Sequence, residues 1–126
     1  MTDAMAIDRL FIANRGEIAV RIIRAARELG IHTIQAYSEA DADMLAVQMA
    51  DEAVCVGPAQ ATQSYLNIES LVKAARDTKA DAVHPGYGFL AENASFAASV
   101  REAGLLFVGP SAECIRAMGD KINSRQ

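Results

Sequence analysis

The sequence predicts an α/β fold in which helices cover both faces of a parallel sheet, as a three-layer α/β/α sandwich. Short apolar runs of strand length alternate along the chain with longer segments of helical periodicity, and no internal repeat is visible. The 126 residues fit one domain of ordinary size. Because 52% of the residues are hydrophobic and 22% are charged, the chain belongs to the globular class and not to the disordered class.

Five apolar runs predict the strands, and turn residues end three of them. The runs cover residues 10–13, 33–37, 53–56, 81–84 and 105–108. A Gly-Pro or Pro-Gly pair follows the third, fourth and fifth runs. Strands that are joined in this way by helices form right-handed parallel crossovers, which is the arrangement of an open, Rossmann-like sheet.

Helical periodicity predicts four helices between these strands. The first opens at the turn 14–17 and runs to Leu29, and Gly30 follows it in the position that favours glycine. The others cover residues 44–50, 68–78 and 93–103, and Asn67 is the expected N-cap of the third. A further short helix is expected from Ser111.

Charge and hydropathy exclude two classes of partner. Twelve Lys and Arg against sixteen Asp and Glu give a formal charge of -4, and the dispersed basic residues argue against nucleic-acid binding. No apolar run approaches the roughly 20 residues that cross a bilayer, and the first ten residues lack the apolar core of a signal peptide. We expect a cytoplasmic protein, or one from an organelle whose targeting segment is not in this sequence.

Cysteines and histidines provide no recognisable metal or catalytic spacing. Cys55 and Cys114 lie in apolar contexts, which predicts buried packing thiols. His32 and His84 have no acid-base partner at recognisable spacing, so the simplest interpretation of each is structural. His84 nevertheless precedes Pro85 at a strand end, which is a good position for a site residue.

The segment GYGFLA at residues 86–91 matches the glycine pattern of dinucleotide-binding turns, but only weakly. That pattern normally follows the first strand and is accompanied by an acidic residue at the end of the next strand. Here the next strand ends in Gly109-Pro110. Two interpretations stay open: a strained turn with a packed Tyr87, or a loop that contacts a ligand at the carboxyl edge of the sheet.

The turn after the first strand is chemically unsuited to phosphate. It contains a single glycine, Gly16, and Glu17 places a carboxylate where an anion would otherwise bind. We interpret Glu17 as a cap of its own helix. The acids after the second strand, Glu39 and Asp41, are expected to form a solvated connector.

A charged stripe follows the first helix at three- or four-residue spacing, through Glu17, Arg21, Arg24 and Glu28. It predicts two ion pairs on a solvated face, with a subunit interface as the alternative. Lys121 stands near a helix start, where a cation is disfavoured unless an anion joins it. It is therefore either a phosphate-binding residue or an exposed lysine.

Six stretches together resemble one family, the N-terminal domain of biotin carboxylase found in acyl-CoA and pyruvate carboxylases. They are FIANRGEIAVRIIRAARELGI, YSEADAD, ADEAVCVGP, SYLNI, HPGYGFLAEN and FVGPSAECIRAMGDK. The resemblance implies a pre-ATP-grasp domain of a ligase that uses ATP, bicarbonate and magnesium (or manganese) to carboxylate biotin through carboxyphosphate. It implies a biotin carboxyl carrier protein or domain and a carboxyltransferase as partners, and a homodimer.

The resemblance also implies roles for individual residues. Lys121 matches a lysine that contacts the nucleotide phosphates, while Tyr87 and Gly88 match positions beside biotin. The family's homodimer contact is matched on the first helix by Arg21, Arg24 and Glu28. Ala91 stands where many relatives have serine. No catalytic residue and no metal ligand is carried over, because the family places them beyond this domain.

The resemblance divides the chain into an N-terminal domain at residues 1–119 and the start of a helix at residues 120–126 that leads towards an ATP-grasp domain. A helix of that length is unstable alone, so we expect the chain to be part of a longer protein. The resemblance implies that this protein is an enzyme, and we expect the chain alone to be inactive, because it supplies at most one cation for the phosphates, Lys121. Two alternatives are a nucleotide-binding or dimerisation domain without catalysis, and a nicotinamide-dependent oxidoreductase domain.

Overall fold

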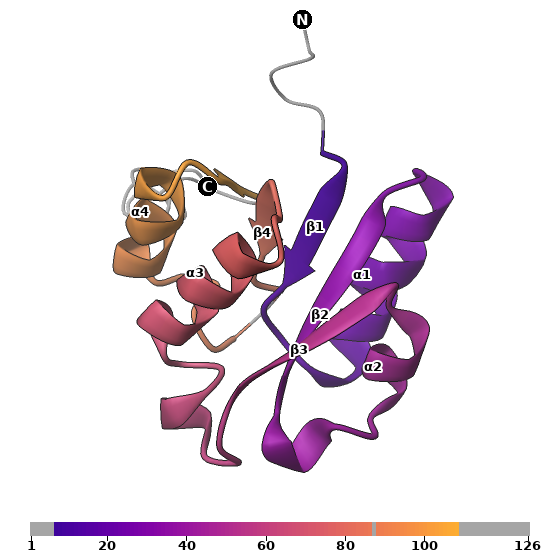
Figure 1. The fold of residues 1–126 in the computed structure, drawn as a ribbon, viewed down its shortest axis with the longest axis horizontal. Helices are drawn as coiled ribbons and strands as arrows, with labels where there is room; N and C mark the ends of the chain where they lie inside the picture. Colours follow the sequence, from indigo (N-terminus) through magenta and orange to yellow (C-terminus); the bar gives the residue numbers. More distant parts are fainter. Residues whose placement is uncertain (1–6, 87, 109–126) are drawn as a thin grey trace, which may run out of the picture.

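Five parallel strands form a single sheet at the centre of the molecule, as the sequence predicts (Figure 1). The computed structural model describes residues 7–86 and 88–108. The strand order is β3-β2-β1-β4-β5. The strands are β1 (Arg9–Ile12), β2 (His32–Ser38), β3 (Glu52–Gly57), β4 (Ala82–His84) and β5 (Leu106–Phe107). Since β1 lies in the middle, both of its edges are paired, with β2 on one side and β4 on the other.

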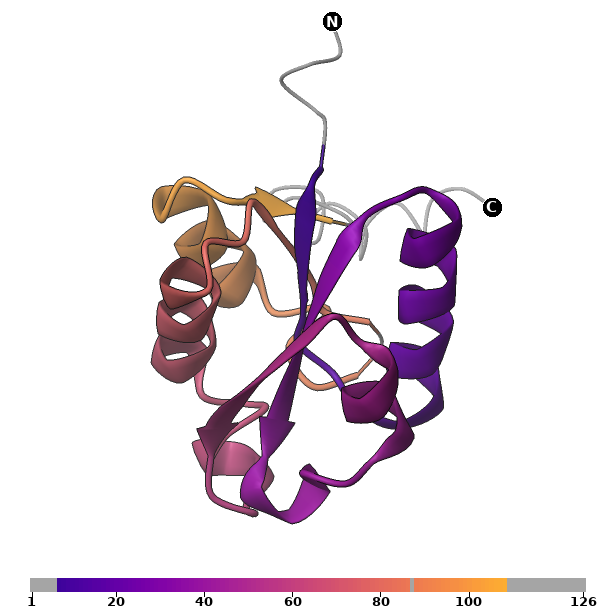
Figure 2. The same cartoon turned by 45° about the vertical axis from the view of Figure 1, so that its right-hand side comes forward.

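Two helices cover each face of the sheet (Figure 2). The helices are α1 (Gly16–Glu28), α2 (Leu45–Met49), α3 (Ile68–Asp77) and α4 (Ala94–Glu102). The α1 and α2 side chains pack on one face, and those of α3 and α4 pack on the other. Short 3-10 turns, η2 (Glu39–Asp41) and η3 (Ala61–Gln63), follow β2 and β3. The helices expected from Ser111 and at residues 120–126 lie outside the described residues.

The central strand shows how the two cores are built. Leu10 and Ile12 pack against α1, and Phe11 packs towards α3 and α4, because successive side chains of a strand point to opposite faces. All three are buried. A strand with two covered faces needs an unbroken apolar run, which is the pattern of β1.

The helix ends follow the capping rules on which the sequence prediction rests. The Asn67 side chain accepts a hydrogen bond from the Ser70 N–H at 3.1 Å, so the expected N-cap is confirmed. Asn93 caps α4 in the same way. Gly30 follows the end of α1 with φ of +75°, a conformation that only glycine adopts without strain.

The prediction of a buried thiol is wrong for Cys55. Cys55 is exposed, because β3 is an edge strand and Cys55 alternates with Val54 and Val56, which pack towards the α3–α4 core. Leu29, the C-cap of α1, is 75% exposed. Cys114 lies outside the described residues.

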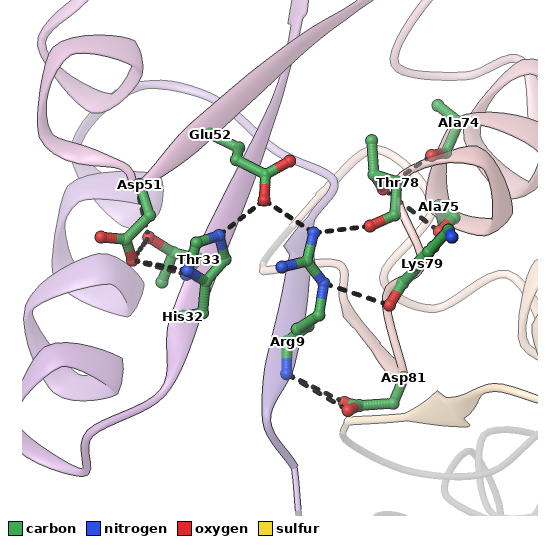
Figure 3. Close-up of polar contacts among 10 residues, drawn as sticks. All are labelled: Arg9, His32, Thr33, Asp51, Glu52, Ala74, Ala75, Thr78, Lys79 and Asp81. Carbon is green, nitrogen blue, oxygen red and sulfur yellow. Dashed lines mark hydrogen bonds and ion pairs between the residues drawn. The ribbon is translucent and has the colours of Figure 1, made fainter.

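Arg9 joins three segments at the amino edge of the sheet (Figure 3). Its Nη2 donates to Glu52 Oε2 at 2.6 Å and to the Thr78 carbonyl at 2.7 Å, and its Nε donates to the Lys79 carbonyl at 3.2 Å. The Arg9 N–H donates to the Asp81 carboxylate at 3.2 Å. One side chain therefore connects the start of β1 with β3 and with the turn before β4.

His32 shares this cluster, and the fold gives it acidic neighbours that its sequence spacing did not reveal. Its Nε2 lies 2.7 Å from Glu52 Oε2, and its Nδ1 lies 3.9 Å from Asp51 Oδ2. The parallel register pairs Ile34 with Glu52, which brings the starts of β2 and β3 together. The hydrogen bond from Arg9, followed by that from His32, lowers the pKa of Glu52.

Within the residues described, no helix is long and apolar enough to cross a membrane.

Candidate site at the carboxyl edge of the sheet

The segments that follow β1, β2 and β4 meet at the carboxyl edge of the sheet. They are residues 13–16 after β1, η2 after β2, and residues 85, 86 and 88–90 after β4. Ligands of open parallel sheets bind at this edge, because the connections to the next helices leave a crevice there. These three segments, together with Tyr65 from the connection after β3, form the candidate site.

A glycine turn follows β4, and residues on both sides constrain its backbone. Gly86 has φ of +68°, and a Cβ atom there would lie 2.7 Å from Asn14 Nδ2. Asn14 Nδ2 also donates to the Pro85 carbonyl at 2.7 Å. Gly88 has φ of +71°, with open space where a side chain would stand. Only glycine fits at residue 86, whereas at residue 88 glycine is favoured by its backbone conformation alone.

The glycine turn does not open a helix, which removes the physical basis of a dinucleotide interpretation. The Gly88 carbonyl accepts from Ala91 N, and α4 begins only at Ala94, behind its cap Asn93. The glycines therefore do not place a phosphate at the start of α4. Tyr87 lies outside the described residues, so whether its ring is packed or faces a ligand stays open.

His84 supports the turn as a hydrogen-bond acceptor. Its Nδ1 accepts from the Gly86 N–H at 3.1 Å, so in this geometry the proton of the neutral ring is on Nε2. Burial lowers the pKa of His84, which favours that neutral form. The structural interpretation of His84 therefore agrees with its contacts.

Asp41 is buried, and the prediction of a solvated connector is wrong for it. Its side chain is 9% exposed, and its Oδ1 accepts from Arg15 Nη2 at 2.7 Å. Its Oδ2 accepts from the hydroxyls of Tyr65 at 2.7 Å and Ser38 at 3.2 Å. The η2 turn folds this carboxylate back under the end of β2, whereas Glu39 in the same turn is exposed as expected.

Tyr65 extends this cluster to the glycine turn. Burial, followed by the hydrogen bond to Asp41, raises the pKa of Tyr65 to about 12, so its hydroxyl stays a donor at neutral pH. The ring stacks on Phe89, with 5.1 Å between the centroids and 14° between the planes. The Arg15 guanidinium lies 5.9 Å from the Tyr65 ring centroid. We call Arg15, Ser38, Asp41, Tyr65 and Phe89 the carboxyl-edge network.

Sequence reasoning missed this network because its members are far apart in the chain. One available signal was their distribution, since they come from the stretches FIANRGEI, YSEADAD, SYLNI and HPGYGF. The turn after β1 also differs from its prediction. The α1 N-cap is Arg15, and Glu17 makes no capping hydrogen bond, although it lies in the first helical turn.

The charged stripe of α1 is exposed. Arg21 Nη2 lies 3.3 Å from Glu17 Oε2, which confirms the first of the two expected ion pairs. The second is wrong, since the pairs found among residues 7–86 and 88–108 do not include one between Arg24 and Glu28. The place of this stripe in a homodimer stays a prediction.

No metal site is found among the described residues. In the part of the chain that the structure describes, no group of three or more His, Cys, Asp or Glu side chains could hold a metal ion. Arg15, the cation at the first turn, is already paired with Asp41. Lys121 lies outside the described residues. The open space beside Gly88 is compatible with a small organic ligand at the glycine turn.

Comparison with known proteins identifies the family. Residues 6–115 match the family described as "Biotin carboxylase, N-terminal domain". The chain is 61% identical to biotin carboxylase 1 of Bacillus subtilis over 120 residues, which are 95% of this chain and 27% of that protein. It is 56% identical to the biotin carboxylase of Pseudomonas aeruginosa over 119 residues, which are 94% of this chain and 26% of that protein. The chain thus spans about a quarter of the length of these relatives.

One solved structure is similar to this chain in both fold and sequence. It is the biotin carboxylase domain dimer of the Hydrogenobacter thermophilus 2-oxoglutarate carboxylase, in complex with MgADP, ADP and bicarbonate. The TM-score is 0.85 at 47% identity, over 94% of this chain and 26% of that chain. Since the family match covers most of the chain and the sheet and helices superpose at this identity, the chain belongs to the family of biotin carboxylase N-terminal domains.

Proposed function

We propose that the chain acts as the N-terminal domain of an ATP-dependent biotin carboxylase, which carboxylates carrier-bound biotin with bicarbonate through carboxyphosphate. The observation that carries this proposal is the 61% identity to a biotin carboxylase along nearly the whole chain. The complex of the Hydrogenobacter relative with MgADP and bicarbonate supports ATP, magnesium (or manganese) and bicarbonate as ligands of the whole enzyme.

The proposed division of labour follows from what the described residues lack. The nucleotide and its metal ion bind mainly to the other regions of the enzyme, because residues 7–86 and 88–108 contain neither a metal-binding group nor an unpaired cation at the carboxyl edge. The domain occupies residues 1–119, and Lys121 adds one contact to the ATP phosphates. Tyr87 and Gly88 lie beside biotin, where the glycine turn leaves backbone room.

The proposed partners are a biotin carboxyl carrier protein or domain, a carboxyltransferase and a second copy of the enzyme. The exposed positions of Arg21, Arg24 and Glu28 on α1 are compatible with a homodimer contact. We propose a cytoplasmic location with no nucleic-acid partner. A nicotinamide-dependent oxidoreductase is disfavoured, because neither the turn after β1 nor the glycine turn presents a phosphate site at a helix start.

A chimera tests this function directly. Residues 1–119 replace the matching N-terminal region of Bacillus subtilis biotin carboxylase 1, and ATP cleavage is measured with and without bicarbonate and free biotin. We expect turnover that requires both substrates and is of the same order as that of the parent enzyme. The control is the same chimera with Gly86→Val, which places a side chain against Asn14. A folded chimera that binds ATP but shows no biotin-dependent turnover would contradict the proposal.

A further inference from the structure

We propose that Asp41 and Tyr65 are positioning residues for biotin, which they orient indirectly by holding the glycine turn through Phe89. The proposal rests on the function proposed above. It assigns a role to the turn after β1 as well, since Arg15 from that turn holds Asp41. The turn would thus serve as a clamp at the position where dinucleotide-binding folds hold a phosphate.

The Asp41 side chain is buried at the carboxyl edge of the sheet. A carboxylate that is 9% exposed loses most of its hydration, so it persists only where donors replace the lost water. Arg15, Ser38 and Tyr65 supply three donors from three different segments. The carboxylate therefore fixes the position of the Tyr65 hydroxyl relative to the ends of β1 and β2.

Tyr65 in turn contacts Phe89. Tyr65 is 1% exposed, and its hydroxyl accepts from the Ser38 N–H at 3.1 Å as well as donating to Asp41, so the buried ring is held in place through its hydroxyl. Phe89 has φ of +43°, which is unfavourable for a residue with a side chain, and is 37% exposed. The stack on a rigid ring compensates for this backbone strain. The conformation of Phe89 therefore depends on Tyr65.

The entrance of the glycine turn is held by a different residue, Asn14. Asn14 donates to the Pro85 carbonyl and touches Gly86, so it holds the entrance of the turn while Phe89 anchors its exit. Asn14 and Arg15 are consecutive residues, and together they reach both anchors, one directly and one through Asp41 and Tyr65. Gly88, with its open side, lies between the two anchors. A shift of about 1 Å in such a support can cost on the order of a hundredfold in rate.

Substitutions in the active chimera separate this role from general stability. Tyr65→Leu removes the stacked ring, and Asp41→Asn removes an acceptor, because an amide accepts at one oxygen only. We expect both to raise the KM for free biotin about tenfold or more while leaving the KM for ATP unchanged. Tyr65→Phe keeps the ring and should give a smaller rise. Lys73→Ala, which breaks an exposed ion pair with Asp77 on α3, is the control and should change neither KM.

Coupling between Tyr65 and Phe89 provides a sharper test. Phe89→Leu alone should raise the KM for biotin as Tyr65→Leu does, and the double variant should show no further rise, since both changes remove one contact. Equal rises in the KM for biotin and for ATP, or independent effects that multiply, would overturn the positioning role. Thermal melts of every variant confirm that the compared molecules are folded.

Amide hydrogen exchange makes the clamp testable without turnover. Ala91 N donates to the Gly88 carbonyl and Asn93 N to the Leu90 carbonyl, so both amides report on the exit of the turn. Faster exchange of these two amides in Tyr65→Leu, but not in Lys73→Ala, supports the clamp, and unchanged exchange overturns it. If the unsubstituted chimera is inactive, the proposed function fails, while exchange in the folded chimera still decides whether the clamp exists.

Discussion

His84 shows how one titratable group can stabilise a turn that carries no charge of its own. The ring accepts a backbone hydrogen bond from Gly86 through Nδ1, and protonation of that nitrogen would replace the acceptor with a donor. Burial opposes the same protonation. The side chains that line the groove around His84, between α1 and the end of β5, are mainly apolar, and Arg21 is the one charged side chain among the described residues that line it.

The lowered pKa of His84 predicts a loss of stability on acidification. Above the ordinary pKa of 6.5 the ring is neutral in both states and stability is complete. As the pH falls below 6.5, the unfolded chain binds the proton first, so the free energy of unfolding decreases until the pH reaches the folded-state pKa. Urea unfolding from pH 7.5 to 5 measures this decrease.

The matched variant is His84→Asn, whose amide oxygen can accept from Gly86 without titrating. It should lose stability less steeply than the native chain over the same range, because the two proteins differ only at residue 84. Identical slopes in the two proteins would show that His84 does not contribute.

Tyr87 offers a second prediction for a single residue. In the active chimera, Tyr87→Ala should impair carboxylation of biotin while the fold and the affinity for ATP stay nearly intact, because the ring would orient a ligand. If the ring were instead packed in the core, the same change should cost roughly 3 to 5 kcal/mol of stability. One thermal melt and one kinetic measurement distinguish the two. A lower melting temperature with unchanged turnover per folded molecule would return Tyr87 to the core.

At the scale of elements, β1 is held at its amino end by Arg9 and at its carboxyl end by Asn14. The two residues reach different neighbours: Arg9 reaches β3 and the turn after α3, whereas Asn14 reaches the turn after β4. Apolar packing alone fixes β1 against the helices, but it does not fix where the strand ends. These polar contacts at both ends secure the register of the central strand.

We therefore expect Arg9→Met to be more destabilising than the loss of its ion pair alone. The substitution keeps an apolar stem but removes the hydrogen bonds to the carbonyls of Thr78 and Lys79, which should cost about 1–3 kcal/mol. Glu52→Gln removes the charge that faces Arg9 and His32 but keeps an acceptor oxygen, and because these contacts are partly exposed it should cost about 1 kcal/mol or less. Urea unfolding of both variants checks this order. Equal losses would show that the carbonyl contacts contribute nothing.

Elements whose signals are local could be predicted from the sequence. Asn67 and Gly30 mark helix ends through contacts within a few residues, and the apolar runs identify all five strands. Interactions between distant segments could not be predicted, because they depend on strand order. Asp41 meets Arg15 and Tyr65 only after the sheet has assembled. The exposure of Cys55 likewise follows from the position of β3 at an edge, which no local pattern records.

At the scale of the whole molecule, the described residues form a scaffold that presents a turn and not a complete catalytic centre. Both cores are closed by helices, and the polar contacts concentrate at the two edges of the sheet. Phosphoryl transfer depends on cations placed around the phosphates, and here the first-turn cation is already neutralised by Asp41.

The 126-residue chain alone should therefore fold but neither cleave ATP nor carboxylate biotin. The fold is expected to persist because both faces of the sheet are covered within the chain. Circular dichroism with a thermal melt tests folding, and phosphate release with bicarbonate and biotin tests activity. Bicarbonate-dependent ATP cleavage that survives Lys121→Ala would contradict both the assignment of Lys121 and the proposed division of labour.

The central position of β1 has a consequence for the order in which the molecule can be assembled. Its first neighbour, β2, follows after a single helix, but on the other side Leu10 must wait for Ala82, the most distant partner in the sheet. Closing so long a loop costs the most chain entropy of any pairing here. On the ribosome, a nascent chain that stops before residue 82 therefore exposes the edge of β1 that later pairs with β4. Such an edge is a template for pairing with another chain, so aggregation during synthesis should be most severe in this interval and end when β4 emerges.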